Sequence, residues 1–206
     1  MPLINIENKD ANIENIVKLC NLNQESLFID LGANEGQQVV YLDENSIESI
    51  AFEPHPVIFE KLKKSVKNLN NKTALYNNAA WVKDETMNLF FKKNPIEVNG
   101  GSSLIFEKTN VVKTHAYSVE AIDFSKFLKN LNRNVDILKI DIEGSEYHVI
   151  EHLIINNTID YCKNLFVEDH ERKIEKNTQF YKEYIEKRSY VHAFFKNSQI
   201  NYYNWK

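Results

Sequence analysis

Residues 26–36 read SLFIDLGANEG and join a short apolar run to a turn that holds two glycines. An apolar run of this length, without alternation, is typical of a strand buried on both faces of a parallel sheet. Glycine lets the backbone pass close to a ligand, and the helix expected to start near Glu35 offers free N–H groups in its first turn. The stretch therefore predicts a strand, a tight turn and a helix, with a binding site at the turn.

The same alternation of apolar runs and amphipathic segments continues along the chain, which implies a parallel sheet with right-handed crossovers. Residues 86–120 interrupt it with three strand-like segments (MNLFFK, SSLIF and VVKTHAYSV) around the turn at 94–101, so we expect an antiparallel insertion beside the active site. The C-terminal segments SYVHAFF and INYYNW predict a β-hairpin across 196–199. The other strands are expected at 47–52, 73–81, 135–142 and 164–169, and the helices at 12–22, from Pro56 to Leu69, and at 124–131, 145–155 and 178–187.

Length and composition indicate one ordinary domain, because 206 residues with 43% hydrophobic and 26% charged side chains suit a single globular core. We expect one domain over residues 1–206, with an N-terminal helical segment at 1–24 and the insertion at 86–120 near the acceptor site. No apolar run approaches the roughly 20 residues that span a bilayer. We therefore expect a soluble protein of the cytoplasm with no membrane partner. The sequence does not indicate an oligomeric state.

An acidic residue, Glu53, ends the strand that follows the first turn. At that place a carboxylate can accept hydrogen bonds from both hydroxyls of an adenosine ribose. The turn lacks the pattern of a dinucleotide site, because Asn34 and Gln37 stand where G-x-G-x-x-G requires glycine. The Asp30 carboxylate suits a cationic ligand and would repel a pyrophosphate. These features favour S-adenosylmethionine, which carries a sulfonium and an ammonium group, over NAD.

The expected cofactor site combines this turn with the ends of three further strands. Its residues are Asp30, Gly32, Ala33, Asn34, Gly36, Glu53, Pro54, Asn78, Ala79 and Asp141.

Acidic residues and a histidine end two further predicted strands. Asp141 and Glu143 follow the most apolar strand, and Glu168 and His170 follow the next one. Because the carboxyl ends of neighbouring parallel strands meet at one edge of a sheet, these side chains should lie together over the cofactor. If a hydroxyl group receives the methyl group of S-adenosylmethionine, it needs a base to take its proton or a metal ion to make that proton more acidic. His170 is the preferred base because its ordinary pKa is near neutrality, and Asp141 and Glu143 are further catalytic candidates.

Other roles remain open for these residues. Asp141 could position the amino-acid end of the cofactor, Glu143 could cap the following helix, and His170 could be a surface residue. The three could also bind one divalent cation, although an acidic cluster that binds substrate hydroxyls directly is favoured and no metal is expected. The candidate substrate-binding residues are Ser102, Ser103 and Glu168.

Several stretches, taken in order, resemble the FkbM family of methyltransferases. They are FIDLGANEG at 28–36, FEP at 52–54, NAA at 78–80 and LKIDIEGSE at 138–146, with GSSL at 101–104 as a further similar feature. The resemblance covers about residues 27–170. It implies a Rossmann-like class I methyltransferase fold with a mostly parallel seven-stranded sheet, and O-methylation, often of a sugar hydroxyl. It does not name the acceptor.

The favoured interpretation is an enzyme that uses S-adenosylmethionine to O-methylate a sugar, a glycan or a related small molecule. The second interpretation is a methyltransferase that acts on a nucleic acid or a protein. The net charge of −4 and the lack of a basic arm argue against nucleic acid. An NAD-dependent oxidoreductase is disfavoured by the turn at 32–37. A non-catalytic S-adenosylmethionine-binding module is disfavoured by the intact Asp30, Glu53 and Asp141.

Overall fold

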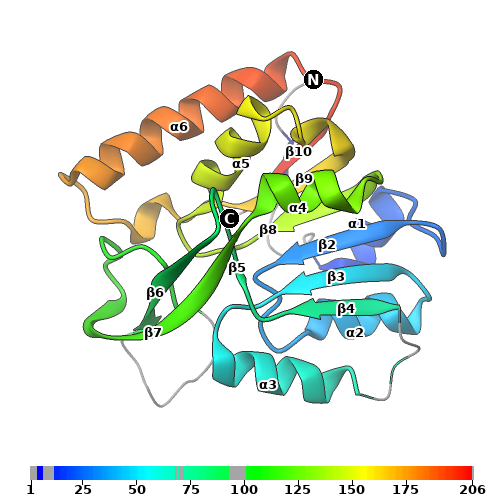
Figure 1. The fold of residues 1–206 in the computed structure, drawn as a ribbon. Coiled ribbons are helices and arrows are strands. Elements are labelled where there is room, and N and C mark those ends of the chain that lie inside the picture. Colours follow the sequence, from blue (N-terminus) through cyan, green and yellow to red (C-terminus); the bar gives the residue numbers. More distant parts are fainter. Residues whose placement is uncertain (1–3, 7–11, 68, 70–71, 93–100, 206) are drawn as a thin grey trace.

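The computed structural model describes residues 4–6, 12–67, 69, 72–92 and 101–205. Within these ranges, ten strands form two sheets (Figure 1). The larger sheet contains β1 (Ile4–Ile6), β2 (Leu27–Leu31), β3 (Glu48–Phe52), β4 (Thr73–Tyr76), β8 (Val135–Ile140), β9 (Cys162–Glu168) and β10 (Asn201–Trp205). The smaller sheet contains β5 (Ala79–Trp81), β6 (Glu85–Lys92) and β7 (Val111–Asp123).

The larger sheet has the strand order β1-β10-β9-β8-β2-β3-β4, and every neighbouring pair is parallel. The chain runs outward from β2 through β3 to β4, and later outward from β8 through β9 to β10. The strand order thus reverses between β2 and β8, which lie side by side. In open α/β sheets, ligands bind at the carboxyl ends of the strands at such a reversal. The predicted α/β class and mainly parallel sheet are confirmed.

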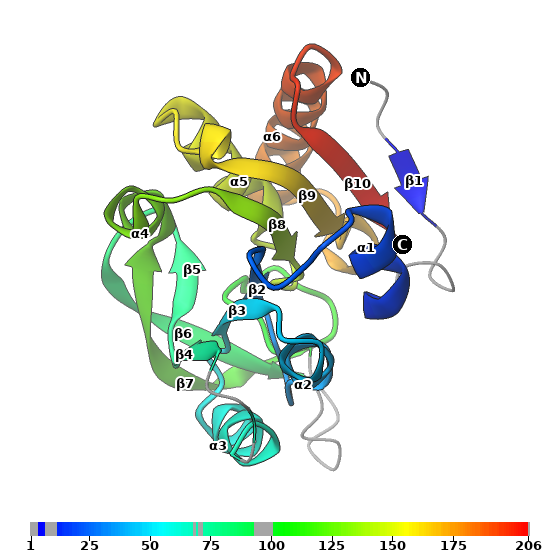
Figure 2. The ribbon, with the colours of Figure 1, turned by 90° about the vertical axis from the view of Figure 1, so that its right-hand side faces the viewer.

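Helices cover both faces of this sheet (Figure 2). The side chains of β2 explain why: Ile29 and Leu31 join the core cluster that contains residues of α4, α5 and α6, whereas Phe28 packs with residues of α1 and α2. A strand buried on both sides is mostly apolar, as predicted for this stretch, and β2 carries one buried charge, Asp30. The helices are α1 (Ile13–Leu19), α2 (Gln37–Glu44), α3 (Pro56–Ser65), α4 (Phe124–Leu131), α5 (Glu146–Ile155) and α6 (Gln179–Lys196), with short 3₁₀ turns η1 (Ile159–Tyr161) and η2 (Glu171–Lys173).

The predicted C-terminal β-hairpin is wrong. Residues up to Lys196 continue α6, and β10 pairs in parallel with β9, so the two C-terminal segments are not paired with each other. Aromatic residues favour strands, and this local preference suggested the hairpin. The helix is favoured because its period places Tyr184, Val191 and Phe195 on one face of α6, where they are buried in the core.

Two other segments differ from the sequence prediction. The strand predicted at 73–81 is divided between the two sheets, as β4 and β5. The N-terminal segment at 1–24 is not helical throughout, because β1 precedes α1 and extends the sheet beside β10.

The insertion is antiparallel as predicted, with β6 paired to β7. Its middle segment, SSLIF, is not a strand, since Ser103 makes only an isolated bridge to Phe90. Most of the predicted turn at 94–101 falls outside the described residues.

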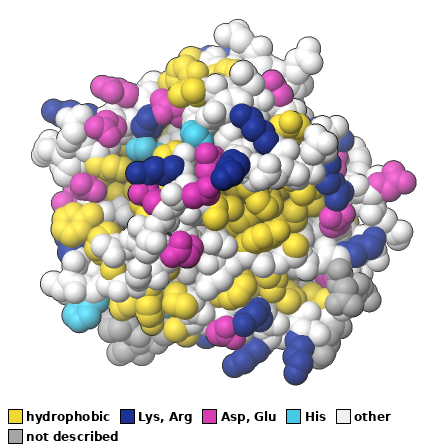
Figure 3. Space-filling model, in the orientation of Figure 1, with side chains coloured by type: hydrophobic (Ala, Val, Ile, Leu, Met, Phe, Trp, Pro, Cys, Tyr) yellow, Lys and Arg dark blue, Asp and Glu magenta, His cyan; other side chains and the backbone are white. Residues whose placement is uncertain are grey.

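The surface seen in Figure 3 carries an area of hydrophobic side chains that borders a group of acidic, lysine and histidine side chains. Within the described ranges, no helix is long and apolar enough to cross a bilayer.

The turn after β2 passes so close to the end of β8 that only glycine fits at residue 32. Gly32 has a φ of +89°, and a Cβ atom placed on it would lie 1.9 Å from the backbone oxygen of Asp141. The N–H groups of Gly32 and Ala33 both donate to the carbonyl oxygen of Phe52, each at 3.0 Å. The turn is therefore fixed against β3 as well as against β8.

We predict that Gly32→Ala lowers the free energy of unfolding by about 2 kcal/mol more than Gly101→Ala does. Both substitutions place a side chain at positive φ, but the atoms nearest to the added Cβ at residue 101 belong to side chains: Lys92 at 3.1 Å, which can move, and Glu143 Oε1 at 3.6 Å, an ordinary contact. Urea denaturation of the two variants measures the difference. Equal losses would show that the backbone of Asp141 does not restrict residue 32.

Candidate functional site

An open cavity of about 710 Å³ lies at the carboxyl ends of β2, β3 and β8. Its position is the reversal point of the strand order, where open α/β sheets bind ligands. The connection between β4 and β5, strand β6 and the segment that follows Gly101 complete its walls. Among the residues predicted for the cofactor site, those that line the cavity are Gly32, Asn34, Glu53, Pro54, Asn78, Ala79 and Asp141.

Glu53 is a buried carboxylate in the wall of this cavity. Its Oε2 accepts a hydrogen bond from the Asn34 N–H at 2.9 Å, and its Oε1 accepts one from the His55 N–H at 2.8 Å. Burial raises the pKa of Glu53 to about 7, although these two N–H groups oppose the rise. Each carboxylate oxygen keeps a further lone pair. Glu53 is thus held in one orientation with acceptor capacity left for a ligand.

Asp30 differs from its prediction as a direct ligand of the cofactor. Its side chain is buried, does not line the cavity, and accepts a hydrogen bond from Lys139 Nζ at 2.8 Å. Lys139 Nζ is also 3.7 Å from Asp141 Oδ2. Although burial lowers the pKa of Lys139, the two carboxylates outweigh it and raise that pKa. Asp30 therefore acts through Lys139, which joins β2 to β8 and holds Asp141.

Two other residues of the turn shape it without lining the cavity. Ala33 is buried in the cluster that packs α2 and α3 against the sheet. Gly36 is the N-cap of α2 at a φ of +87°, where an added Cβ would lie 2.4 Å from a Leu62 methyl group.

Glu143 lines the cavity, but two lysines hold its carboxylate. Its Oε2 forms an ion pair with the fully buried Lys108, and Lys173 Nζ lies 3.3 Å from the same oxygen. Burial raises the pKa of Glu143, but Lys108, His170 and Lys173 outweigh this and bring it to about 2. Glu143 is therefore an ionised, neutralised group and a poor candidate for a base. Lys108 was not predicted, because it lies in the insertion outside the GSSL stretch at 101–104.

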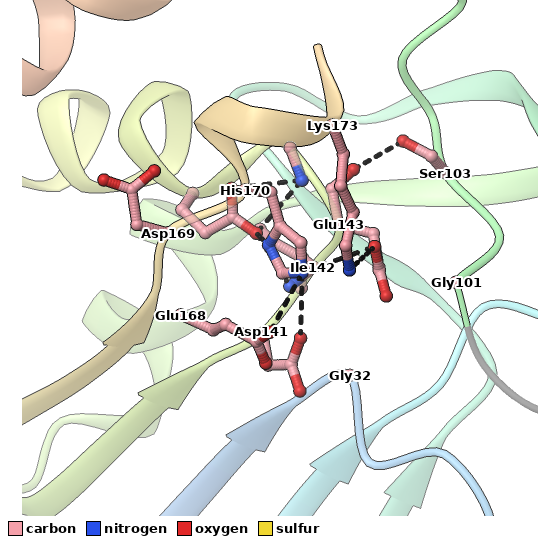
Figure 4. A network of polar contacts seen from close by, with 12 residues as sticks. Gly32, Gly101, Ser103, Asp141, Ile142, Glu143, Glu168, Asp169, His170 and Lys173 are labelled. Carbon is pink, nitrogen blue, oxygen red and sulfur yellow. Dashed lines mark hydrogen bonds and ion pairs between the residues drawn. The ribbon is translucent and has the colours of Figure 1, made fainter. Parts of the chain in front are cut away.

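His170 lies behind the cavity wall, with 1% of its side chain exposed. Its Nδ1 is 2.8 Å from Glu146 Oε1, and its Nε2 faces carboxylate oxygens of Glu143, Glu168 and Asp141 at 3.3, 3.5 and 3.8 Å (Figure 4). Burial lowers the pKa of His170, but Glu146, Glu143 and Asp141 outweigh this and raise it to about 9. His170 does not line the cavity. Its placement does not favour the predicted role of a base that acts directly on the acceptor.

Glu146 is the most important residue that the sequence reasoning did not select. It is fully buried, and its Oε1 accepts hydrogen bonds from the N–H groups of Ile142 at 3.2 Å and Gly144 at 3.0 Å. The same oxygen holds His170 Nδ1. Glu146 therefore fixes both the turn after β8 and the orientation of the imidazole ring. Its place at the end of the LKIDIEGSE stretch at 138–146, which resembles the family, is the signal that could have selected it.

The predicted substrate-binding residues occupy different positions. Ser102 lines the cavity, whereas Ser103 is buried and its Oγ donates to the carbonyl oxygen of Glu143 at 2.7 Å. Ser103 thus has a structural contact and does not line the cavity. Glu168 lies outside the lining, beside His170. Asp169 points away from this group of side chains (Figure 4).

We predict that Lys139→Met lowers the free energy of unfolding by about 3–5 kcal/mol, because it leaves the Asp30 carboxylate buried without a counter-ion. The double variant Asp30→Asn/Lys139→Met should recover a large part of that loss, since neither buried charge remains. Urea denaturation at neutral pH measures both. A double variant no more stable than the single one would mean that the two side chains are not coupled.

Glu53 should make the protein less stable as pH rises. Its pKa is about 7 in the folded protein and near the ordinary value of 4.5 in the unfolded chain. The folded state therefore binds the proton more tightly, and the stabilisation present below about pH 4.5 is lost by pH 7, a change of about 3 kcal/mol. Glu53→Gln should remove this part of the pH dependence. The free energy of unfolding of both proteins, measured by urea denaturation at several pH values, tests this. If it changed with pH by the same amount in both, the assignment would be contradicted.

Comparison with known proteins agrees with this geometry. The sequence model of the family described as "Methyltransferase FkbM domain" matches residues 30–192. A protein of Beauveria bassiana (strain ARSEF 2860), named "Methyltransferase 1", is 30% identical over 165 residues. That match covers 67% of this chain and 65% of the relative, so the chain spans less than two thirds of the relative's length. The matched range of the family begins at the Asp30 turn and includes every element around the cavity except the N-terminal part of β2. The chain therefore belongs to the FkbM methyltransferase domain family.

Proposed function

We propose that the protein transfers a methyl group from S-adenosylmethionine to a hydroxyl group of a sugar, a glycan or a related small molecule. The observation that carries the proposal is the Glu53 carboxylate, which the backbone of Asn34 and His55 holds in the wall of a cavity at the strand reversal. Membership of a methyltransferase family indicates which reaction such a cavity serves.

The residues around the cavity fit an adenosyl group. Both oxygens of Glu53 can each accept one more hydrogen bond, which matches the two hydroxyls of a ribose. Phe52, Ile58 and Leu89 supply apolar walls for a flat base, and Gly32 adds no side-chain bulk to the turn. S-adenosylmethionine would supply, when bound, a methyl group on a sulfonium that an oxygen nucleophile can attack, and S-adenosylhomocysteine would be the leaving group. The hydroxyl group must lose its proton, and the partly exposed Asp141 carboxylate is the group proposed to take it. The protein contributes chiefly by placing the acceptor in line.

The lining also supports a neutral, hydroxyl-rich acceptor. Asp141 presents a partly exposed carboxylate, and Ser102 adds a hydroxyl group that can donate or accept. Carboxylate oxygens bind sugar hydroxyls by accepting hydrogen bonds from them. Among the described lining residues there is no lysine or arginine, the side chains that a phosphate-bearing acceptor requires. A nucleic acid is therefore not the proposed acceptor, and Asp141 is the residue proposed to position the hydroxyl.

The direct test is binding of S-adenosylhomocysteine, measured by isothermal titration calorimetry. We expect wild-type protein to bind it and Glu53→Gln to bind at least tenfold more weakly, since hydrogen bonds to a charged group contribute about 1.5–3 kcal/mol. Glu186→Gln, which changes an exposed glutamate of α6, should leave the affinity unchanged.

Transfer of a labelled methyl group from S-adenosylmethionine to a panel of glycans and uncharged glycosides tests the acceptor. The expected product is an alkali-stable methyl ether. Stabilisation by NADH in place of S-adenosylhomocysteine would overturn the cofactor proposal. Cofactor binding with transfer only to protein or nucleic acid would overturn the acceptor proposal.

A further inference from the structure

We propose that Asp141, Glu168 and His170 form a binding site for one divalent cation at the edge of the cavity. Each residue offers one ligand atom, and the three atoms lie within 4.8 Å of one another. They come together because β8 and β9 are parallel neighbours, with Asp141 immediately after β8 and His170 shortly after β9. Figure 4 shows the carboxylates of Asp141 and Glu168 on the same side of the His170 ring.

The separations suit ligands around a single ion. His170 Nε2 is 3.5 Å from a Glu168 oxygen and 3.8 Å from an Asp141 oxygen. Ligand atoms at about 2.1 Å from one ion lie about 3.0 Å apart when adjacent and about 4.2 Å apart when opposite. The three side chains therefore need only small rotations to reach a common ion.

An unpartnered nitrogen atom points into this group. His170 is buried, and its Nε2 has no hydrogen-bond partner among the described residues. The other ring nitrogen is held by Glu146 at 2.8 Å. A carboxylate on Nδ1 keeps one proton there, so a cation that displaces the proton of Nε2 would meet a lone pair directed at the carboxylates, as in the histidine ligands of metal proteins. A buried polar atom without a partner requires an explanation, and a cation in front of it provides one.

The two glutamates near Nε2 of His170 differ in whether lysines neutralise them. Glu143, the ligand expected from the sequence, is already neutralised by Lys108 and Lys173. Among the described residues, no lysine or arginine forms an ion pair with Glu168, whose side chain is 30% exposed. Glu168 therefore replaces Glu143 in the proposed set. Its ion pair among the described residues is with His170, at 3.5 Å, and its exposure gives an ion access from solvent.

One imidazole nitrogen and two carboxylate oxygens suit a first-row divalent ion such as Mn²⁺ better than an all-oxygen ion such as Ca²⁺. The remaining coordination positions are open to water or to a hydroxyl group. Because Asp141 also lines the cavity, a bound ion would lie beside the acceptor and could polarise its hydroxyl. This last role rests on the proposed function, whereas binding of the ion does not.

Electron paramagnetic resonance of the full chain with Mn²⁺ alone tests the site, without cofactor or acceptor. We expect one Mn²⁺ per chain in the micromolar range, with nitrogen modulation in the pulsed spectrum from the imidazole ligand. Glu168→Gln should weaken binding at least tenfold, and His170→Gln should abolish the nitrogen modulation. Glu186→Gln, an exposed glutamate on α6, is the matched control and should bind like wild type.

Absence of Mn²⁺ binding, or binding without nitrogen modulation, would overturn the proposal, and so would equal affinity in Glu168→Gln. Nε2 would then carry a proton and pair with the carboxylates as an imidazolium. Should His170→Gln fail to fold, the wild-type modulation and the Glu168→Gln titration still decide the question. Either result leaves the cofactor proposal intact, since S-adenosylhomocysteine binding is measured separately.

Discussion

A buried ion pair between Asp30 and Lys139 joins the two strands on which the rest of the structure depends. β2 and β8 are adjacent where the strand order reverses, and this pair links them under the floor of the cavity. A buried charge is tolerated only when a partner compensates it, so neither residue can be lost alone. The same lysine reaches toward Asp141, and Gly32 fits against the backbone of that residue. The position of the cavity wall thus follows from one interstrand contact.

Above this floor, the acidic residues of the site differ in what holds them, and their chemistry differs accordingly. Backbone N–H groups hold Glu53, lysines neutralise Glu143, and the fully buried Glu146 orients His170. Asp141 keeps a partly exposed carboxylate at the cavity. Residues of one chemical type therefore differ in role: Glu53 is the proposed contact to the cofactor, Glu143 a neutralised structural anion, Glu146 a positioning group and Asp141 the proposed contact to the methyl acceptor.

Local patterns were sufficient to predict the framework of the sheet. The apolar run of β2, its glycine turn and the acid at residue 53 each carry a short-range signal, and they lie where predicted. Lys139 carried a signal that was not used, because a lysine inside an otherwise apolar strand must find a buried anion. The hairpin prediction failed where the strand preference of aromatic residues and the helical period disagreed over 189–196, and burial favoured the helix.

The sequence predicted that Asp141, Glu143, Glu168 and His170 would lie together, and they do. It did not predict what holds each of them, because the lysines on Glu143 and the carboxylate behind His170 come from the insertion, η2 and α5. The sequence alone favoured an acidic cluster without metal, and only the packing shows an unpartnered nitrogen facing it. The same packing favours Glu168 over Glu143 as a ligand of the proposed cation.

The central claim is that the cavity binds S-adenosylmethionine through Glu53. A crystal structure with bound S-adenosylhomocysteine tests it most directly: both ribose hydroxyls should lie within hydrogen-bond distance of Glu53, and a ligand bound elsewhere, or with Glu53 unengaged, would contradict it.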